Sequence, residues 1–197
     1  MRVGFGLLVL ILALSSPASA EWQVKPFLGV TFGGETTFYD NEQAVGSANI
    51  VFGGSGLLLG EVFGVEGDFG YAPGFFTKER VLVLASRVAT LTGNVVVALP
   101  RHLSEYSLRP YFVGGAGFVH AGAEGSFGVA EVNRTLPVMD LGGGVTGFLS
   151  KRIGVNWDVR YFRSSSKPDR QGELQGPIPE DRRLSFWRFH TAMAIRF

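Results

Sequence analysis

Apolar and polar residues alternate along eight separate segments of the sequence, and no other feature restricts the fold as much. The last segment, WRFHTAMAIRF, shows the pattern: counting back in twos from Phe197 gives a mostly apolar face, whereas Arg188 and Arg196 fall on the other. A period of two belongs to β-strands, whose successive side chains point to opposite faces. We therefore expect strands over about residues 22–33, 48–59, 61–75, 84–99, 108–120, 136–149, 152–163 and 184–197.

The connections between these strands alternate in length. Long polar connections follow the first, third, fifth and seventh expected strands, as in GETTFYDNEQAVG, AGAEGSFGVAEVNR and Ser164–Arg183. Shorter turns near Gly60 and within SKR follow the second and sixth, and the connection Pro100–Ser107 is of middle length. Each strand also reaches the roughly 9–11 residues that a tilted membrane strand needs. This asymmetry is typical of outer-membrane barrels, whose short turns lie on the periplasmic side, and it would place both chain termini there.

The first and last expected strands indicate that the sheet closes on itself. In an open sheet both would be exposed edges, which are templates for aggregation. In a bilayer, closure is required because unpaired backbone groups find no water there. A final strand that runs to Phe197 is expected to be the one that closes the sheet. The predicted fold class is therefore all-β: an eight-stranded antiparallel up-and-down transmembrane β-barrel, preceded by a cleaved signal peptide.

The first twenty residues have the features of a secretory signal peptide. Arg2 supplies the positive charge, Phe5–Leu14 the apolar run, and Ala18–Ala20 the small-residue cleavage site. A membrane anchor is disfavoured because a spanning helix needs about 20 apolar residues. We expect cleavage after Ala20, which divides the chain into a signal peptide over 1–20 and one barrel domain over 21–197.

The composition excludes several classes of function. The sequence has no cysteine, so neither disulfides nor cysteine-based zinc sites can form. The chain has 18 Lys and Arg against 17 Asp and Glu, and loss of Arg2 makes these numbers equal, which gives no indication of nucleic-acid binding. The stretches FGGSG, GGAG and GGGV precede no helical pattern and no GK[ST] sequence, so they are not phosphate loops. We expect no cofactor and no metal ion.

The stretches GVEGDFGYAPGFF, GNVVVALP, RPYFVGGAGF, LGGGV and DVRYF, together with the terminal Phe197, resemble a known family. This is the group of small eight-stranded outer-membrane β-barrel proteins (OmpA-barrel, OmpX and OmpW-like), often labelled outer-membrane β-barrel or porin-family proteins. The resemblance implies export through the periplasm to the cell outer membrane, with the lipid bilayer as partner. It also implies that Phe197 is part of the signal read by the barrel-assembly machinery. No peptidoglycan-binding segment follows the barrel, so an OmpA-type cell-wall tether is not expected.

Histidine is the first residue type to consider for catalysis, because some eight-stranded barrels are enzymes. The three histidines are His102, His120 and His190. Lipid A deacylase barrels carry a serine two residues after the histidine, but at that spacing His190 is followed by Ala192 and His120 by Gly122. Palmitoyl-transfer barrels use His, Asp and Ser near the outer rim, and the segment Ser164–Asp169 lacks a histidine. We therefore expect no enzymatic activity and no catalytic residue.

Charged side chains are also predicted for the inward faces of the strands. They are Glu66, Asp68, Asp140, Asp158, Arg160, Arg188 and Arg196. They could form a selective pore or a proton path, or they could pair and fill the lumen. Eight strands enclose a space just wide enough for side chains, and a buried charge left alone costs several kcal/mol. This size argument favours a structural ion-pair network that plugs the lumen.

Aromatic residues near the strand ends predict the two girdles of a membrane barrel. We expect Trp22, Phe63, Tyr111 and Phe197 at the periplasmic interface, and Phe75, Phe76, Tyr161 and Trp187 at the outer one.

Three functions remain open on the sequence alone. The first is an outer-membrane barrel with a structural or surface-interaction role, the ligand of whose outer loops is unknown. The second is an OmpW-like barrel that passes small apolar molecules across or into the outer membrane, which the predicted lumen charges disfavour. The third is a soluble, secreted lipocalin-like carrier, although the first strand has LGVTFGG in place of a Gly-x-Trp motif.

Overall fold

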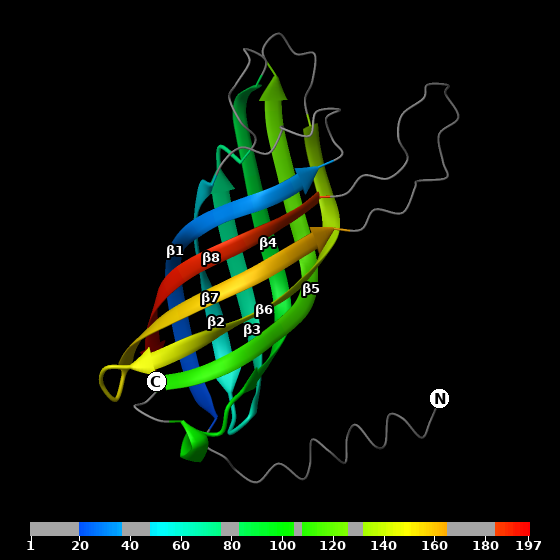
Figure 1. The fold of residues 1–197 in the computed structure, drawn as a ribbon. Helices are drawn as coiled ribbons and strands as arrows, with labels where there is room; N and C mark the ends of the chain where they lie inside the picture. Colours follow the sequence, from blue (N-terminus) through cyan, green and yellow to red (C-terminus); the bar gives the residue numbers. More distant parts are fainter. Residues whose placement is uncertain (1–19, 37–47, 76–82, 105–107, 126–131, 165–183) are drawn as a thin grey trace, which may run out of the picture.

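The computed structural model describes residues 20–36, 48–75, 83–104, 108–125, 132–164 and 184–197, and it is built almost entirely of strands (Figure 1). The strands are β1 (Glu21–Thr36), β2 (Asn49–Leu59), β3 (Phe63–Pro73), β4 (Val83–Ala98), β5 (Leu108–Gly125), β6 (Val132–Phe148), β7 (Ile153–Ser164) and β8 (Leu184–Arg196). One short 3-10 helix, η1 (Arg101–Leu103), follows β4. No helix in the described part of the chain is long and apolar enough to cross a membrane.

The strands form a closed barrel in the order of the sequence. Each strand pairs antiparallel with its neighbours along the chain, and β1 also pairs antiparallel with β8, for example through Val30 and Phe189. The backbone N–H of Phe197 donates to the carbonyl oxygen of Trp22 at 3.0 Å, so the pairing continues to the last residue of the sequence. The predicted all-β barrel with eight antiparallel strands is confirmed, and closure leaves no exposed sheet edge.

Side chains alternate between the outer wall and the interior, with apolar groups outside. On β3, Phe63 is 69% exposed and Val65 is 58% exposed, whereas Glu66 and Asp68 are buried. This pattern suits a wall in contact with hydrocarbon, because lipid-facing and lumen-facing residues alternate in membrane barrels. A lipocalin-like carrier requires the opposite arrangement, so the structure argues against that alternative.

The short connections lie together at one end of the barrel, which we call the short-turn end. They are residues 60–62, the described residues 99–104 that follow β4, and residues 149–152. The backbone N–H of Gly60 donates to Phe63 O at 2.8 Å, and that of Leu149 donates to Ile153 O at 3.0 Å. These tight turns agree with the sequence prediction. At the opposite end β1, β3, β5 and β7 stop, and the sequence after them runs through residues 37–47, 76–82, 126–131 and 165–183, which lie outside the described residues.

The strand bounds differ most from expectation at β5 and β6. Both strands continue beyond the predicted ends at His120 and Leu136, and Ala123 still pairs with Val132. The stretch AGAEGSFGVAEVNR was therefore wrongly predicted as a connection over its whole length. Backbone hydrogen bonds extend the ladder past the point where the apolar alternation stops, because they need no apolar side chain.

Buried side chains form three zones along the barrel axis. An apolar cluster near the short-turn end contains Leu57, Leu59, Val96, Ala98, Tyr111 and Val113. A second apolar cluster, mostly toward the other end, contains Val51, Ala72, Phe75, Val88, Val119, Leu136, Val138, Phe162, Leu184 and Phe186 among its members. Most of the buried charged side chains lie between these two clusters, whereas Glu21 and Arg109 are buried at the short-turn end.

Candidate functional site

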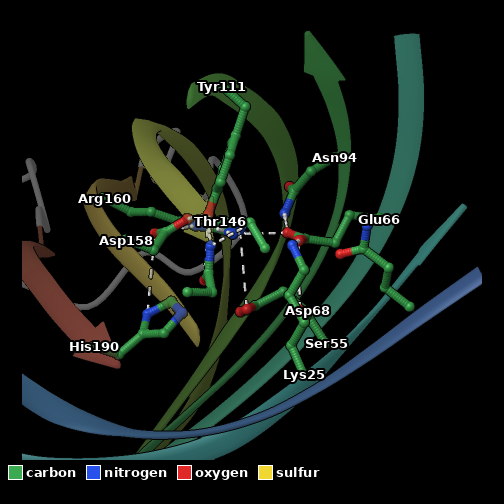
Figure 2. Close-up of polar contacts among 12 residues, drawn as sticks. Lys25, Ser55, Glu66, Asp68, Asn94, Tyr111, Thr146, Asp158, Arg160 and His190 are labelled. Atoms are coloured by element: carbon green, nitrogen blue, oxygen red, sulfur yellow. Dashed lines mark hydrogen bonds and ion pairs between the residues drawn. The ribbon is translucent and has the colours of Figure 1, made fainter. Parts of the chain in front are cut away.

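Charged side chains from five strands meet inside the barrel, as Figure 2 shows for most of them. Lys25 comes from β1, and the others come from β3, β6, β7 and β8. We call Lys25, Glu66, Asp68, Asp140, Asp158, Arg160 and Arg188 the lumen network. None of these residues is more than 4% exposed. Strand alternation explains the arrangement, since Glu66 and Asp68, like Asp158 and Arg160, are two residues apart on one strand.

Arg160 is the residue with the most charged partners in this network. Its Nε and Nη2 donate to the two carboxylate oxygens of Asp158 at 2.8 and 3.0 Å. Its Nη2 is also 2.7 Å from Glu66 Oε1. Asp68 and Asp140 lie further away, with one oxygen of each at 3.9 and 3.7 Å from Nη1. A single guanidinium therefore connects β3, β6 and β7 across the interior.

Asn94 on β4 completes the surroundings of Arg160. In the orientation that satisfies both ends of its amide, the oxygen accepts from Arg160 Nη1 at 2.9 Å and the nitrogen donates to Asp140 Oδ1 at 3.0 Å. The amide thus links the guanidinium to a carboxylate that Arg160 does not reach directly at hydrogen-bond distance.

Arg188 is the second cation of the network and lies between a carboxylate and two aromatic rings. Its Nη2 is 2.8 Å from Asp68 Oδ1. Its guanidinium carbon is 4.9 Å from the ring centre of Phe27 and 4.8 Å from that of Phe162. Its Nε and Nη1 have no hydrogen-bond partner among the described residues. Ring faces attract cations, so the aromatic pair replaces part of the hydration that burial removes.

Lys25 belongs to the network although the sequence analysis did not include it. Its Nζ is 3.6 Å from Glu66 Oε2 and 5.1 Å from the ring centre of Tyr111. The hydroxyl of Ser55 donates to the same Glu66 oxygen at 3.3 Å. The signal was present in the sequence, because Lys25 shares the polar face of its strand with Gln23 and Thr31.

Tyr111 lies inside the barrel and not in the predicted girdle. Its hydroxyl donates to Asp158 Oδ2 at 2.5 Å, and Asn156 Nδ2 donates to the Tyr111 hydroxyl at 2.9 Å. Asn156 Nδ2 also lies 2.9 Å from the hydroxyl oxygen of Thr146. The shared face with Arg109, a charged residue two positions earlier, could have indicated that Tyr111 points inward.

Other predicted girdle residues divide between the two faces. Trp22, Phe63, Trp187 and Phe197 are exposed on the outer wall, and Tyr161 is partly exposed there. Phe75 is buried and packs edge-on against Phe186 with ring centres 5.2 Å apart, so its placement in a girdle was wrong. Phe76 lies outside the described residues. Phe112, which was not predicted, is 76% exposed beside Tyr111 in the sequence.

Arg196, the remaining predicted lumen charge, does not join the lumen network. It lies at the short-turn end, where its Nη1 is 3.4 Å from Glu21 Oε2 and its Nε donates to Lys151 O at 2.8 Å. Alternation along β8 correctly placed it on the inner face, but its distance along the barrel axis separates it from Arg188.

Inward glycines provide room for the largest charged and aromatic side chains. A methyl group added at Gly70 would lie 2.7 Å from Arg188 Nη1. One added at Gly142 would lie 2.8 Å from Arg160 Cγ, and one at Gly144 would lie 2.6 Å from the Tyr111 hydroxyl. Glycine within these strands therefore marks close approach.

The arrangement offers ion pairing but no exposed reactive group. Three cations face four carboxylates, and water-accessible surface is almost absent from all of them. His190 is also buried: it stacks on Phe27 with ring centres 4.2 Å apart, and its Nδ1 is 3.9 Å from Asp158 Oδ1. Among the described residues no group of three or more His, Asp or Glu side chains is placed to hold a metal ion.

The comparisons with known proteins agree with this architecture. The family described as outer membrane protein beta-barrel domain matches residues 6–178. No curated protein matches the sequence.

Among solved structures, Neisserial surface protein A is similar, with a TM-score of 0.65 and 8% identity over 89% of this chain and 97% of that one. The outer membrane protein OprG of Pseudomonas aeruginosa has a TM-score of 0.59 and 10% identity over 91% and 97%. The attachment invasion locus protein Ail of Yersinia pestis, solved with the heparin analogue sucrose octasulfate, has a TM-score of 0.52 and 15% identity over 90% and 99%. At these identities the likeness shows the fold.

Proposed function

Because the chain belongs to the outer membrane protein β-barrel domain family, and so is a barrel of the cell outer membrane, we propose that it is a non-enzymatic protein with a structural or surface-interaction role and a closed interior. The observation that carries this proposal is the pairing of Arg160 with Glu66 and Asp158 across the interior. Eight strands leave space only for side chains, and here large charged side chains occupy the middle of that space.

The apolar clusters above and below the lumen network support the same proposal. Both consist of buried side chains, and Val119 and Phe162 are completely inaccessible to solvent. An ion or a polar solute that crossed the barrel would have to displace packed apolar groups and then separate buried ion pairs. Removing one partner of a buried pair typically costs about 3–5 kcal/mol, so spontaneous opening of such a path would be rare.

Transport of small apolar molecules remains the second candidate. The observation that favours it is the apolar cluster that includes Phe75, Val88 and Phe186, since such a cluster could receive an apolar molecule. Against it, every pair of neighbouring strands is hydrogen-bonded, and the lumen network lies beyond the cluster.

Proteoliposomes separate the two candidates. The purified protein should let neither a small sugar nor a small apolar fluorophore enter vesicles faster than they enter protein-free vesicles. Accelerated entry of the fluorophore alone would support transport, and accelerated entry of the sugar would contradict a closed interior.

We also propose that residues 1–20 are removed on export and that Phe197 contributes to recognition by the barrel-assembly machinery. Phe197 is 80% exposed at the short-turn end, where its side chain is free for contact. The mature protein from the envelope should begin at Glu21 on N-terminal sequencing. Phe197→Asp should lower the amount of barrel in the membrane, whereas normal amounts of this variant would argue against an assembly role.

A further inference from the structure

A cavity of about 430 Å³ lies at the short-turn end of the barrel and is surrounded by cations. Its charged lining residues are Glu21 of β1, Arg101 of η1, Arg109 of β5, Lys151 of the turn after β6, and Arg196 of β8. We call this cavity the basic vestibule. It is separated from the lumen network by the apolar cluster that contains Leu57 and Val96.

The basic vestibule has one carboxylate side chain in its lining, which cannot neutralise the four cationic side chains there. Glu21 pairs with both Arg101 and Arg196. The Arg109 guanidinium donates to the backbone carbonyls of Leu99, Gly60 and Glu61 at 3.0, 3.0 and 2.6 Å, and these carbonyls carry no net charge. A positive excess therefore remains around one shared carboxylate.

Lys151 and Glu61 do not remove this positive excess. Among the described residues no carboxylate pairs with Lys151. Glu61 is a further carboxylate side chain near the vestibule in the described part of the chain. It is exposed on the rim, where its Oε1 accepts the backbone N–H of Arg101 at 3.1 Å and lies 4.0 Å from His102 Nδ1. With Glu61 counted, four cationic side chains face two carboxylate side chains among the described residues.

We propose that the basic vestibule binds an anionic group of the phosphate type. Guanidinium groups suit phosphate because they present several N–H donors in a fixed fork, and an ammonium adds a compact charge. The anion comes from a soluble periplasmic molecule or from the headgroup of a phospholipid. The lining has an apolar side formed by Phe148 and Leu149, of which Leu149 is 81% exposed, and this side suits the apolar part of a phospholipid.

The site stands on its own geometry and does not depend on whether the lumen is closed. Its access to the periplasm follows from the orientation in which short turns lie on the periplasmic side.

Lys151 and Arg152 give a matched pair of variants for the test. They are adjacent and exposed in the same turn, and each change to alanine removes one positive charge, but only Lys151 lines the cavity. Arg109 and Arg196 are unsuitable because their guanidiniums hold backbone carbonyls of the turns. Heat-modifiable migration on gels shows whether each variant forms the barrel.

The first arm measures binding of inorganic pyrophosphate by calorimetry to protein in phosphatidylcholine nanodiscs. The second arm compares the thermal unfolding midpoint in phosphatidylcholine with that in phosphatidylglycerol nanodiscs.

Lys151→Ala should weaken pyrophosphate binding about tenfold if the anion is soluble, as expected for one charge-assisted contact. If the anion is a lipid headgroup, Lys151→Ala should abolish a stabilisation by phosphatidylglycerol that Arg152→Ala retains. Equal effects of the two variants in both arms, or no effect of either anion on the wild type, would overturn the proposal.

Discussion

Arg160 contacts buried carboxylates on both β3 and β7, so its loss should lower the stability of the barrel. Arg160→Ala leaves Asp158 and Glu66 without their closest cation, and we expect the free energy of unfolding to fall by about 3–5 kcal/mol. Asp158→Ala should also destabilise the barrel. Denaturant titration in lipid vesicles measures both variants.

The double variant provides the control for this prediction. Removing Arg160 and Asp158 together should cost less than the two single changes summed, because no charge is then left without its partner, with a coupling of roughly 0.5–3 kcal/mol. Strict additivity would mean that the bidentate contact of 2.8 and 3.0 Å contributes nothing to stability.

Glycines on opposite faces of the wall should respond differently to the same change. In Gly144→Ala the new methyl group would lie 2.3 Å from Trp157 O and 2.6 Å from the Tyr111 hydroxyl, and the former cannot move without shifting β7. In Gly93→Ala it would meet nothing within 4 Å. We expect Gly144→Ala to lower the unfolding midpoint and Gly93→Ala to leave it nearly unchanged. Similar midpoints for both would contradict the close packing described for the interior.

Strand alternation predicted which side chains point inward, but it did not predict which inward side chains contact one another. It placed Asp158, Arg160 and Arg188 on inner faces because charge alternates with apolar residues there. It could not show that Arg188 joins the lumen network whereas Arg196 does not, because the depth of a residue along the barrel depends on the stagger of the strands. Phe75 was misplaced because apolar residues occupy both faces near the strand ends, where alternation carries no information.

At the scale of single elements, the two kinds of connection should tolerate insertions differently. Tight turns fix strand register, so inserting a short Gly/Ser segment at Gly60 or Lys151 should reduce the fraction of heat-modifiable barrel. The same insertion within 35–46 or 164–182 should leave this fraction unchanged, because long loops tolerate insertions. Equal tolerance of all four sites would contradict the assignment of short and long connections to opposite ends.

The outer face of β7 gives a second prediction at this scale. Val159 is exposed on the apolar wall, and it pairs with Gly143 on β6 and with Phe189 on β8. Val159→Arg should destabilise the barrel in lipid vesicles by about 2–4 kcal/mol if this residue lies near the bilayer midplane, and by less near an interface. A change close to zero would mean that this part of the wall does not face lipid.

The strand ends could be predicted from the sequence wherever the alternation of apolar and polar side chains stops at the end of the strand. The turns after β2 and β6 were predictable because the apolar alternation stops and restarts within a few residues. The extension of β5 and β6 to Gly125 and Val132 was not, because the residues there continue the ladder through backbone pairing alone.

For the whole molecule, closure was predictable from edge strands and the family resemblance, but the order of zones along the interior was not. The sequence indicated inward charges, whereas the apolar clusters on both sides of them combine residues from nearly every strand. Such layers depend on shear and tilt, which together determine which residues lie at one depth. The basic vestibule arises in the same way, since its cations come from segments that are far apart in the sequence.

Single-channel conductance in planar bilayers is the most direct test of a closed interior. The wild-type protein, with insertion verified by its heat-modifiable form, should give no steady conductance steps at any voltage that the bilayer withstands. A porin reconstituted in the same bilayers provides the positive control. Steady, large steps from the wild-type barrel would show a continuous water-filled path and contradict an interior closed by Arg160 and its carboxylate partners.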